Sequence, residues 1–172
     1  MTDFEKMLVI LRYEEGQSLI ACPDPAGQIR TWAIGSGHQI TDKTICAALD
    51  QESKEQFLPG SLTCNEQLAE AMLRIQAQEA LNNAKGRFRD LRGVRLIAIA
   101  VAIYQLGHTF LWWTDTCFAI EREGWPAAAD AMRDSKWHNK QTPERAERVC
   151  KMIESGEWPE WIKELQAKEA KP

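Results

Sequence analysis

The spacing of apolar residues divides the chain into helical segments and one segment of a different kind. Apolar residues recur at helical intervals over residues 3–14 and again over about 63–83, which predicts two amphipathic helices. From Leu96 to Tyr104 the chain is apolar nearly all round, as in a helix enclosed by other helices. Between residues 19 and 40, prolines and glycines separate short apolar-polar alternations, which predicts hairpins.

Start and stop signals define the other predicted helices. Thr2 with Glu5 and Thr63 with Glu66 have the spacing of capping boxes, and Gly107 ends the apolar helix. Further helices are expected over about residues 42–49, 109–122, 126–137, 143–155 and 159–168.

The order of these elements predicts one α+β domain over residues 1–172 that is divided into two lobes. A small β-hairpin lobe spans about 15–62, a long connecting helix spans 63–84, and a larger helical lobe combines 1–14 with 85–172. A cleft between the two lobes is the expected place for a substrate.

Composition narrows the class of protein further. With 44% hydrophobic and 27% charged residues, the 172-residue chain reads as an ordinary globular protein. The N-terminus lacks the basic and apolar stretches of a secretory signal, and the longest apolar run is too short to span a bilayer, so no membrane anchor is expected. The five cysteines include no Cys-x-x-Cys pair and the three histidines lack ligand spacing, which predicts reduced thiols and no metal.

Charge is unevenly distributed along the chain. The net charge is −4, yet residues 84–151 hold 12 cationic against 8 acidic side chains and the remainder holds 9 against 17. The basic part could face an anionic polymer or simply form solvated helix faces. Nucleic acid is not an expected partner, because the whole chain is acidic and no basic-aromatic cluster appears.

Two carboxylates form the candidate catalytic pair. Glu15 ends the first predicted helix, and Asp24 lies in the hairpin that follows it. Glycoside hydrolysis requires such a pair, one acid to protonate the leaving oxygen and one carboxylate to act on water or on the sugar. Spacing alone is weak evidence, because an acidic chain offers many pairs of this kind.

Three motifs give the pair a context. Glu15-Gly16, Pro23-Asp24-Pro25 and the stretch Trp32 to His38 (WAIGSGH) resemble the N-terminal signature of the phage-type lysozymes, glycoside hydrolase family 24. Val94 to Gly107 resembles the central helix of that family. Residues 135–149 (SKWHNKQTPERAERV) resemble its C-terminal motif, most closely in the T-even phage enzymes, with Lys140 as a one-residue insertion. The resemblance covers nearly the whole chain.

The resemblance implies roles for individual residues. Glu15 matches the general acid, Asp24 the carboxylate that positions or activates water, and His38 a mostly structural histidine. The family threonine that orients water aligns with Ala33, which is the favoured assignment. Thr31, two residues earlier on the same face of a strand, would replace it if the hairpin were bulged.

The missing threonine leaves three interpretations open. Thr31, Ser36 or another group orients the water, or the enzyme is weakened or inactive, or a threonine has been deliberately replaced by Ala33. Because a hydroxyl group in this role positions water rather than supplying charge, its loss can reduce the rate by several orders of magnitude.

Five further residues have supporting or alternative roles. Arg145 resembles the arginine that pairs with the catalytic glutamate, against the alternative of an ordinary surface arginine. Gln105 and Trp137 resemble a buried pair behind the cleft, in which the indole N–H needs a partner. Trp112 and Trp113 either stack on sugar or, as is more usual at helical positions, belong to the core.

The resemblance implies a phage endolysin, a muramidase that cleaves the β-1,4 bond between N-acetylmuramic acid and N-acetylglucosamine in peptidoglycan. Such a protein would require no cofactor. It would be a monomer that accumulates in the host cytoplasm and reaches the periplasm and wall after a holin permeabilises the membrane. The alternative is a lysozyme-like module that binds the wall without cleaving it, because a fold does not guarantee chemistry.

Overall fold

The structure is a computed structural model that describes residues 1–16, 18–23, 32–35, 38–39 and 66–169. Its contacts divide the chain into two compact units. The helical unit consists of Met1–Met7 with Ala77–Pro172, and the N-terminal unit consists of Leu8–Gln76. Helices α1 (Asp3–Glu15) and α4 (Glu66–Arg87) each contribute residues to both units.

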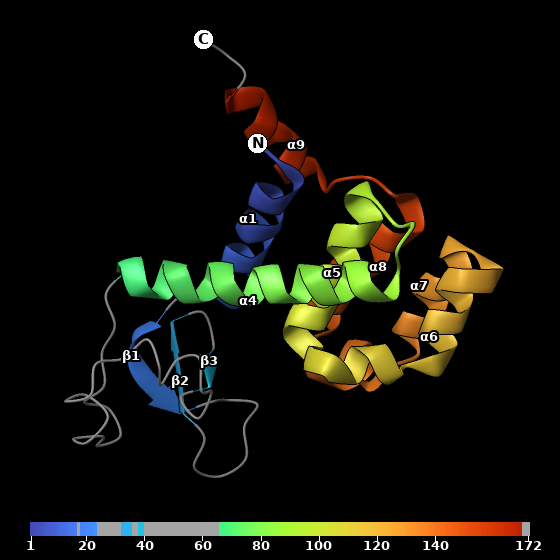
Figure 1. The fold of residues 1–172 in the computed structure, drawn as a ribbon, viewed down its shortest axis with the longest axis horizontal. Coiled ribbons are helices and arrows are strands. Elements are labelled where there is room, and N and C mark those ends of the chain that lie inside the picture. Colours follow the sequence, from blue (N-terminus) through green and yellow to red (C-terminus); the bar gives the residue numbers. More distant parts are fainter. Residues whose placement is uncertain (17, 24–31, 36–37, 40–65, 170–172) are drawn as a thin grey trace. The chain divides into compact units, whose positions relative to one another are not determined.

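The other helices belong to the helical unit and are labelled in Figure 1 where there is room. They are α5 (Gly93–Leu106), the 3-10 helix η1 (Gly107–Trp112), α6 (Thr114–Phe118), the π-helix η2 (Ala119–Glu123), α7 (Trp125–Arg133), the π-helix η3 (Trp137–Gln141), α8 (Pro143–Ser155) and α9 (Glu160–Glu169).

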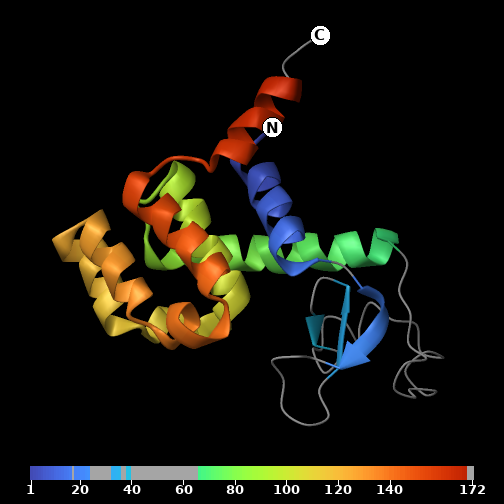
Figure 2. The ribbon, with the colours of Figure 1, turned by 180° about the vertical axis from the view of Figure 1, so that it is seen from behind.

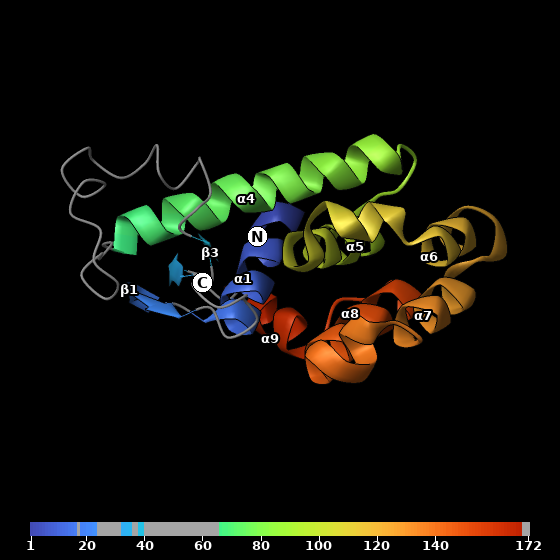
Figure 3. The same ribbon diagram turned by 90° about the horizontal axis from the view of Figure 1, so that it is seen from below.

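Helix α5 forms the centre of the helical unit. Its residues from Leu96 to Ile103 are all buried, as the apolar pattern predicts. Helix α5 packs against α8 and η1, and α8 also packs against α7, as Figures 2 and 3 show. Helix α8 buries one stripe, formed by Ala146, Val149, Cys150, Met152 and Ile153. An enclosed helix and an amphipathic neighbour therefore share one core.

The stretch Gly93–Trp112, which joins α5 to η1, is long and apolar enough to cross a membrane by length and composition alone. Half of its most apolar window is buried inside the protein. A core helix passes the same test, so this property is weak evidence for a membrane span.

The N-terminal unit contains three short antiparallel strands in the order β1-β2-β3: β1 (Ser18–Pro23), β2 (Trp32–Gly35) and β3 (His38–Gln39). In the same unit, the guanidinium group of Arg12 on α1 donates two hydrogen bonds to the carboxylate of Glu70 on α4, at 2.6 and 3.1 Å. Leu8, Leu11 and Leu73, on the same two helices, are fully buried.

The expected α+β class is wrong for the part of the chain that the structure describes. Helices dominate that part, because most of the described residues lie in the largely helical stretches 1–16 and 66–169. The β-hairpin lobe was expected over about 15–62, but three short strands are the only elements described there, and most of that range lies outside the described residues. The protein is therefore mainly α-helical where it is described. The helix expected over 42–49 lies outside the described residues.

Two other predicted helices differ from the structure. The single helix expected over 109–122 is divided into η1, α6 and η2, because the backbone of Trp113 (φ −76°, ψ 82°) interrupts it. The helix expected over 126–137 ends at Arg133, because the hydroxyl group of Ser135 donates to the carbonyl of Met132 at 2.6 Å and accepts the N–H of His138 at 3.3 Å. A serine that bonds the backbone in this way competes with the helix.

The inserted Lys140 lies in the π-helix η3. The N–H of Thr142 donates to the carbonyl of Trp137, five residues earlier, at 3.0 Å. A π turn holds one residue more than an α turn. The insertion is therefore absorbed within η3, and α8 starts at Pro143 as predicted.

Candidate functional site

Glu15 is placed by the end of α1. The N–H of Gly16 donates to the carbonyl of Arg12 at 3.2 Å, and Gly16 has a left-handed backbone (φ 66°) that residues with a Cβ atom rarely adopt. Helix α1 thus stops directly after the candidate acid, as predicted. The side chain of Glu15 is half-buried. At the other end of α1, the N–H of Glu5 donates to the hydroxyl group of Thr2 at 3.2 Å, as the capping box predicts.

Ala33, the favoured match for the family threonine, lies in the middle strand of the sheet. Ala33 on β2 pairs with Cys22 on β1 and with Gln39 on β3, while His38 pairs with Ile34. Asp24 and Thr31 lie outside the described residues. The separation of the two candidate carboxylates, and with it the catalytic pair itself, stays a prediction.

The sheet is irregular in β1 rather than in β2. Cys22 pairs with Ala33 and Pro23 with Trp32, but Ser18 pairs with Gly35, so β1 advances four residues where β2 advances two. Extra residues of this kind form a bulge on the strand that carries them. Ala33 therefore stands in a regular stretch of β2. Both assignments of the water-orienting position stay predictions, because Thr31 lies outside the described residues.

The helical unit holds the supporting residues. Arg145 lies in the first turn of α8 and is half-buried. Gln105 lies near the end of α5, and Trp137 starts η3 and is buried. The expected ion pair between Arg145 and Glu15 stays a prediction.

The hydrogen bond expected between Gln105 and Trp137 is not made in the described part of the chain. Both amide atoms of Gln105 are buried there without a hydrogen-bond partner, as is the hydroxyl group of Thr142. Trp137 instead packs edge-on against Trp113, with ring centroids 6.3 Å apart, and Trp113 lies 5.6 Å from Phe110. Trp137 is thus held by aromatic packing.

The two adjacent tryptophans have different environments. Trp113 belongs to the aromatic cluster with Phe110 and Trp137, which favours the core role considered for it. Trp112 is 80% exposed on η1. Only Trp112 is therefore accessible enough to stack on a sugar.

Sequence reasoning missed a cluster of charges that joins α7 to α8. The guanidinium group of Arg133 donates to Glu147 at 3.1 and 3.3 Å, to Glu154 at 2.7 Å and to Asp130 at 3.1 Å. His138 Nε2 lies 3.1 Å from the same Glu147 carboxylate. The hydrogen bonds from Arg133 lower the pKa of Glu147, and those carboxylates raise the pKa of Arg133. Only the i,i+3 spacing of Asp130 and Arg133 was visible in the sequence.

The two cysteines of the helical unit are unsuited to nucleophilic chemistry. Cys117 and Cys150 are buried free thiols. Burial raises the pKa of both thiols, that of Cys150 to about 12, so neither is a thiolate at neutral pH. No group of His, Cys, Asp or Glu residues that could hold a metal occurs within the described ranges.

Two curated relatives named as T4-type lysozymes are similar to the chain over most of their length. It is 29% identical to "Probable T4-type lysozyme 1" of Dictyostelium discoideum, over 86% of this chain and 92% of the relative. It is 25% identical to "Probable T4-type lysozyme 2" of the same organism, over 88% of this chain and 95% of the relative. No protein-family model matches the chain. The two relatives confirm the resemblance to the phage-type lysozymes.

Proposed function

We propose that the protein is a muramidase that hydrolyses the β-1,4 bond between N-acetylmuramic acid and N-acetylglucosamine in peptidoglycan. The observation that carries this proposal is the match to two proteins named T4-type lysozymes over nearly their full length. The position of Glu15 at the end of α1, next to Gly16, supports it as well.

In the proposed mechanism Glu15, as a carboxylic acid, gives its proton to the glycosidic oxygen while the bond to the anomeric carbon breaks. Asp24 accepts a proton from the water that attacks the anomeric carbon. Carboxyl groups about 6.5–9.5 Å apart would leave room for that water and invert the configuration, whereas about 5 Å would indicate a retaining route. Arg145 would pair with Glu15 and stabilise the carboxylate that remains after the proton has been given up. Glu15 then has to take up a proton again before the next cycle.

Ala33 favours a second candidate function, a lysozyme-like module that binds the wall without cleaving it. An alanine in the regular stretch of β2 offers no hydroxyl group to orient water. The presence of Glu15 and Arg145 beside this change favours the enzyme, because a binding module needs neither a general acid nor the arginine that pairs with it.

The biological setting is part of the same proposal. As an endolysin, the protein would be a monomer held in the host cytoplasm until a holin opens the membrane, and it would then act on the wall from the periplasm. Fractionation of expressing Gram-negative cells tests this setting. The protein should stay in the cytoplasm without a holin, and lysis should require one.

The decisive experiment measures reducing ends released from purified peptidoglycan. Glu15→Gln should lower the rate by about 10²–10⁴-fold, because it removes the proton donor. The matched control is Glu14→Gln, which removes the same charge from the same helical turn and should leave the rate within about twofold. An active Glu15→Gln variant would contradict the mechanism.

The role of position 33 is tested in the same assay. If water is poorly oriented, Ala33→Thr should raise the rate by about 10²-fold, while Ala33→Val, which has the same branched shape without a hydroxyl group, should not. A parent protein that binds peptidoglycan and releases no reducing ends, even as Ala33→Thr, would favour the binding module.

A further inference from the structure

The turn between α4 and α5 concentrates positive charge. The basic turn, as we call it, consists of four exposed cations: Lys85, Arg87, Arg89 and Arg92. Asp90 is the only acidic residue between positions 85 and 92. The helical unit thus presents four cations and one acid within eight consecutive residues.

Two of these cations have no partner in the described part of the chain. Arg87 pairs with Glu121 on η2, and Arg92 Nη1 donates to the carbonyls of Arg89 and, at 2.7 Å, of Leu91. For Lys85 and Arg89, the residues that the structure places supply neither an ion pair nor a side-chain hydrogen bond. Their charges therefore remain available to a ligand, whereas Arg87 and Arg92 already bind groups within the protein.

The backbone of the turn is held in place. Phe88, in the middle of the basic turn, is buried with 6% of its surface exposed, and its N–H donates to the carbonyl of Ala84 at 2.9 Å. The N–H of Leu91 then donates to the carbonyl of Phe88 at 3.1 Å. A buried anchor between exposed cations presents those cations on a fixed base, which lowers the entropy lost on binding.

The local charge rather than the net charge governs what such a turn attracts. At an ionic strength of about 0.1 M, charges are screened beyond roughly 10 Å, so the acidic remainder of the chain acts only weakly at this turn. The complementary partner is anionic. The only aromatic ring of the turn is buried, so no surface is offered for base stacking, and a single-stranded nucleic acid is not favoured.

We propose that the basic turn is a second contact with peptidoglycan, separate from catalysis, which binds the carboxylates of the peptide stems through Lys85 and Arg89. The inference rests on the proposed function, which brings the protein to a polymer that repeats those carboxylates along every strand. Each exposed ion pair is weak, at most about fivefold in affinity. A second contact on one polymer raises the local concentration of glycan at the catalytic residues without a strong individual bond.

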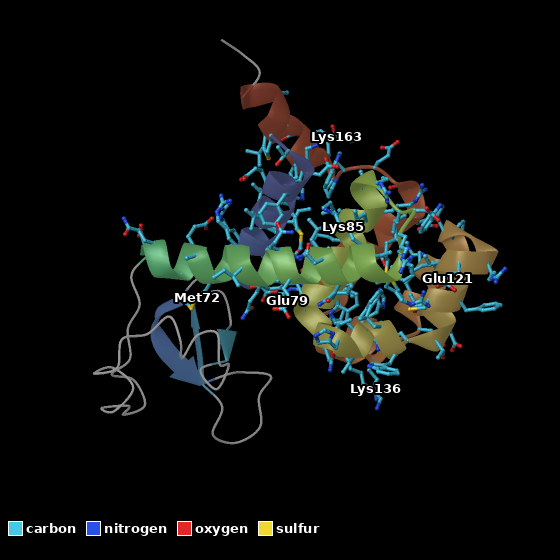
Figure 4. The ribbon with its side chains drawn as sticks, viewed as in Figure 1. Met72, Glu79, Lys85, Glu121, Lys136 and Lys163 are labelled. Atoms are coloured by element: carbon cyan, nitrogen blue, oxygen red, sulfur yellow. The ribbon has the colours of Figure 1, made fainter. Side chains whose placement is uncertain are left out.

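The experiment measures cosedimentation with intact sacculi. The test variant is Lys85→Gln with Arg89→Gln, and the control is Lys136→Gln with Lys140→Gln, two exposed cations that lie elsewhere in the helical unit. Figure 4 shows Lys85 on α4 well away from Lys136. Both pairs change the net charge equally. All proteins also carry Glu15→Gln, which keeps the sacculi intact if Glu15 is catalytic.

The expected result is an affinity for sacculi lowered about fivefold to tenfold by the test pair at low salt and unchanged by the control pair. The difference should vanish at high salt, and on sacculi whose carboxylates have been converted to amides. Equal loss in both pairs, or no loss in either, would overturn the proposal. So would a test pair that keeps its affinity for sacculi but loses binding to vesicles of anionic phospholipid or to single-stranded DNA.

Failure of the proposed function gives a different pattern. Hydrolysis of glycan strands of alternating N-acetylmuramic acid and N-acetylglucosamine, freed of their peptide stems and measured with Glu15 intact, tests the muramidase chemistry apart from the peptide stems. Activity there with unchanged sacculus binding in the test pair would overturn only the second contact. No activity there, with sacculus binding lost in the test pair, would overturn only the muramidase.

Discussion

The core of the helical unit and the strands of the N-terminal unit differ in what the structure defines, which is side-chain contacts in the core and backbone pairing in the strands. In the core, the buried run of α5 and the charges between α7 and α8 are defined by their own contacts. In the strands, the backbone pairing of Ala33 and His38 is defined, and their proposed roles come from the resemblance to proteins named as lysozymes. The comparison indicates that stability resides largely in the helical core, while the proposed chemistry depends on a few residues at the ends of elements.

Truncation in the core should have the largest effect on stability. Ile99 on α5 is completely buried, so Ile99→Ala should lower the free energy of unfolding by about 2–5 kcal/mol, from lost apolar burial and the cavity left behind. Denaturant unfolding measures this change. The control is Ile75→Ala on α4, where half of the side chain is exposed and the loss should be much smaller. A loss of activity per folded molecule in Ile99→Ala would contradict the separation of core and chemistry.

A backbone position at the end of α8 should have a smaller effect. Gly156 has a left-handed backbone (φ 71°), and a Cβ atom there would lie 2.8 Å from the guanidinium carbon of Arg95. That guanidinium group donates to the carbonyls of Ile153 and Glu154 at 2.9 and 3.2 Å, and it lies 4.6 Å from the centre of the Trp125 ring, so it cannot move freely. Gly156→Ala should therefore cost about 1–3 kcal/mol of unfolding free energy, measured as a lowered midpoint of unfolding.

A second glycine supplies the opposite result. Gly86 lies within α4, is exposed, and has open space where a Cβ atom would be. Gly86→Ala should raise the free energy of unfolding by about 0.4–1 kcal/mol, because alanine loses less conformational entropy in a helix. Equal destabilisation by both substitutions would show that the effect at Gly156 is not local strain and contact.

The sequence predicted helices well wherever apolar spacing and a terminal signal agreed. Helix α1 begins at the Thr2 cap and ends before Gly16, and α5 ends at Gly107, which has a positive φ of 64°. These features depend on neighbouring residues only, so a single sequence reveals them. The helix expected over 109–122 was wrong, because the conformation of Trp113 depends on the aromatic cluster that it joins through tertiary packing.

The fold class and the candidate site were less accessible to sequence reasoning. Proline and glycine punctuation predicted a β-lobe, but turn residues mark breaks in a chain without specifying how much strand lies between them, and the described protein is mainly helical. The end of α1 at Glu15 was predictable because a helix end is a local signal, whereas the role of Glu15 as the acid stays a prediction. The charge cluster around Arg133 was missed because Glu147 and Glu154 reach it from another helix.

The charge cluster around Arg133 should have the smallest effect on stability, and this effect should depend on pH. Hydrogen bonds from Arg133 lower the pKa of Glu147 from the value of 4.5 for a free glutamate, so folding favours the ionised carboxylate. The resulting stability is present above pH 4.5 and is lost as pH falls through the lower pKa of the folded protein. Because both side chains are partly exposed, Arg133→Gln should cost only about 1 kcal/mol at neutral pH.

The pH dependence of that cost tests its origin. The difference in unfolding free energy between Arg133→Gln and the parent should shrink as pH falls from 4.5 through the lowered pKa of Glu147 in the folded parent, because the protonated carboxyl group no longer carries the charge that Arg133 binds. The control is Arg122→Gln, an exposed arginine for which no ion pair is made with the residues that the structure places. A difference that stays constant with pH would mean that Arg133 stabilises the protein through packing of its aliphatic stem. The contact between α7 and α8 would then be stabilised by apolar packing, as the core around α5 is.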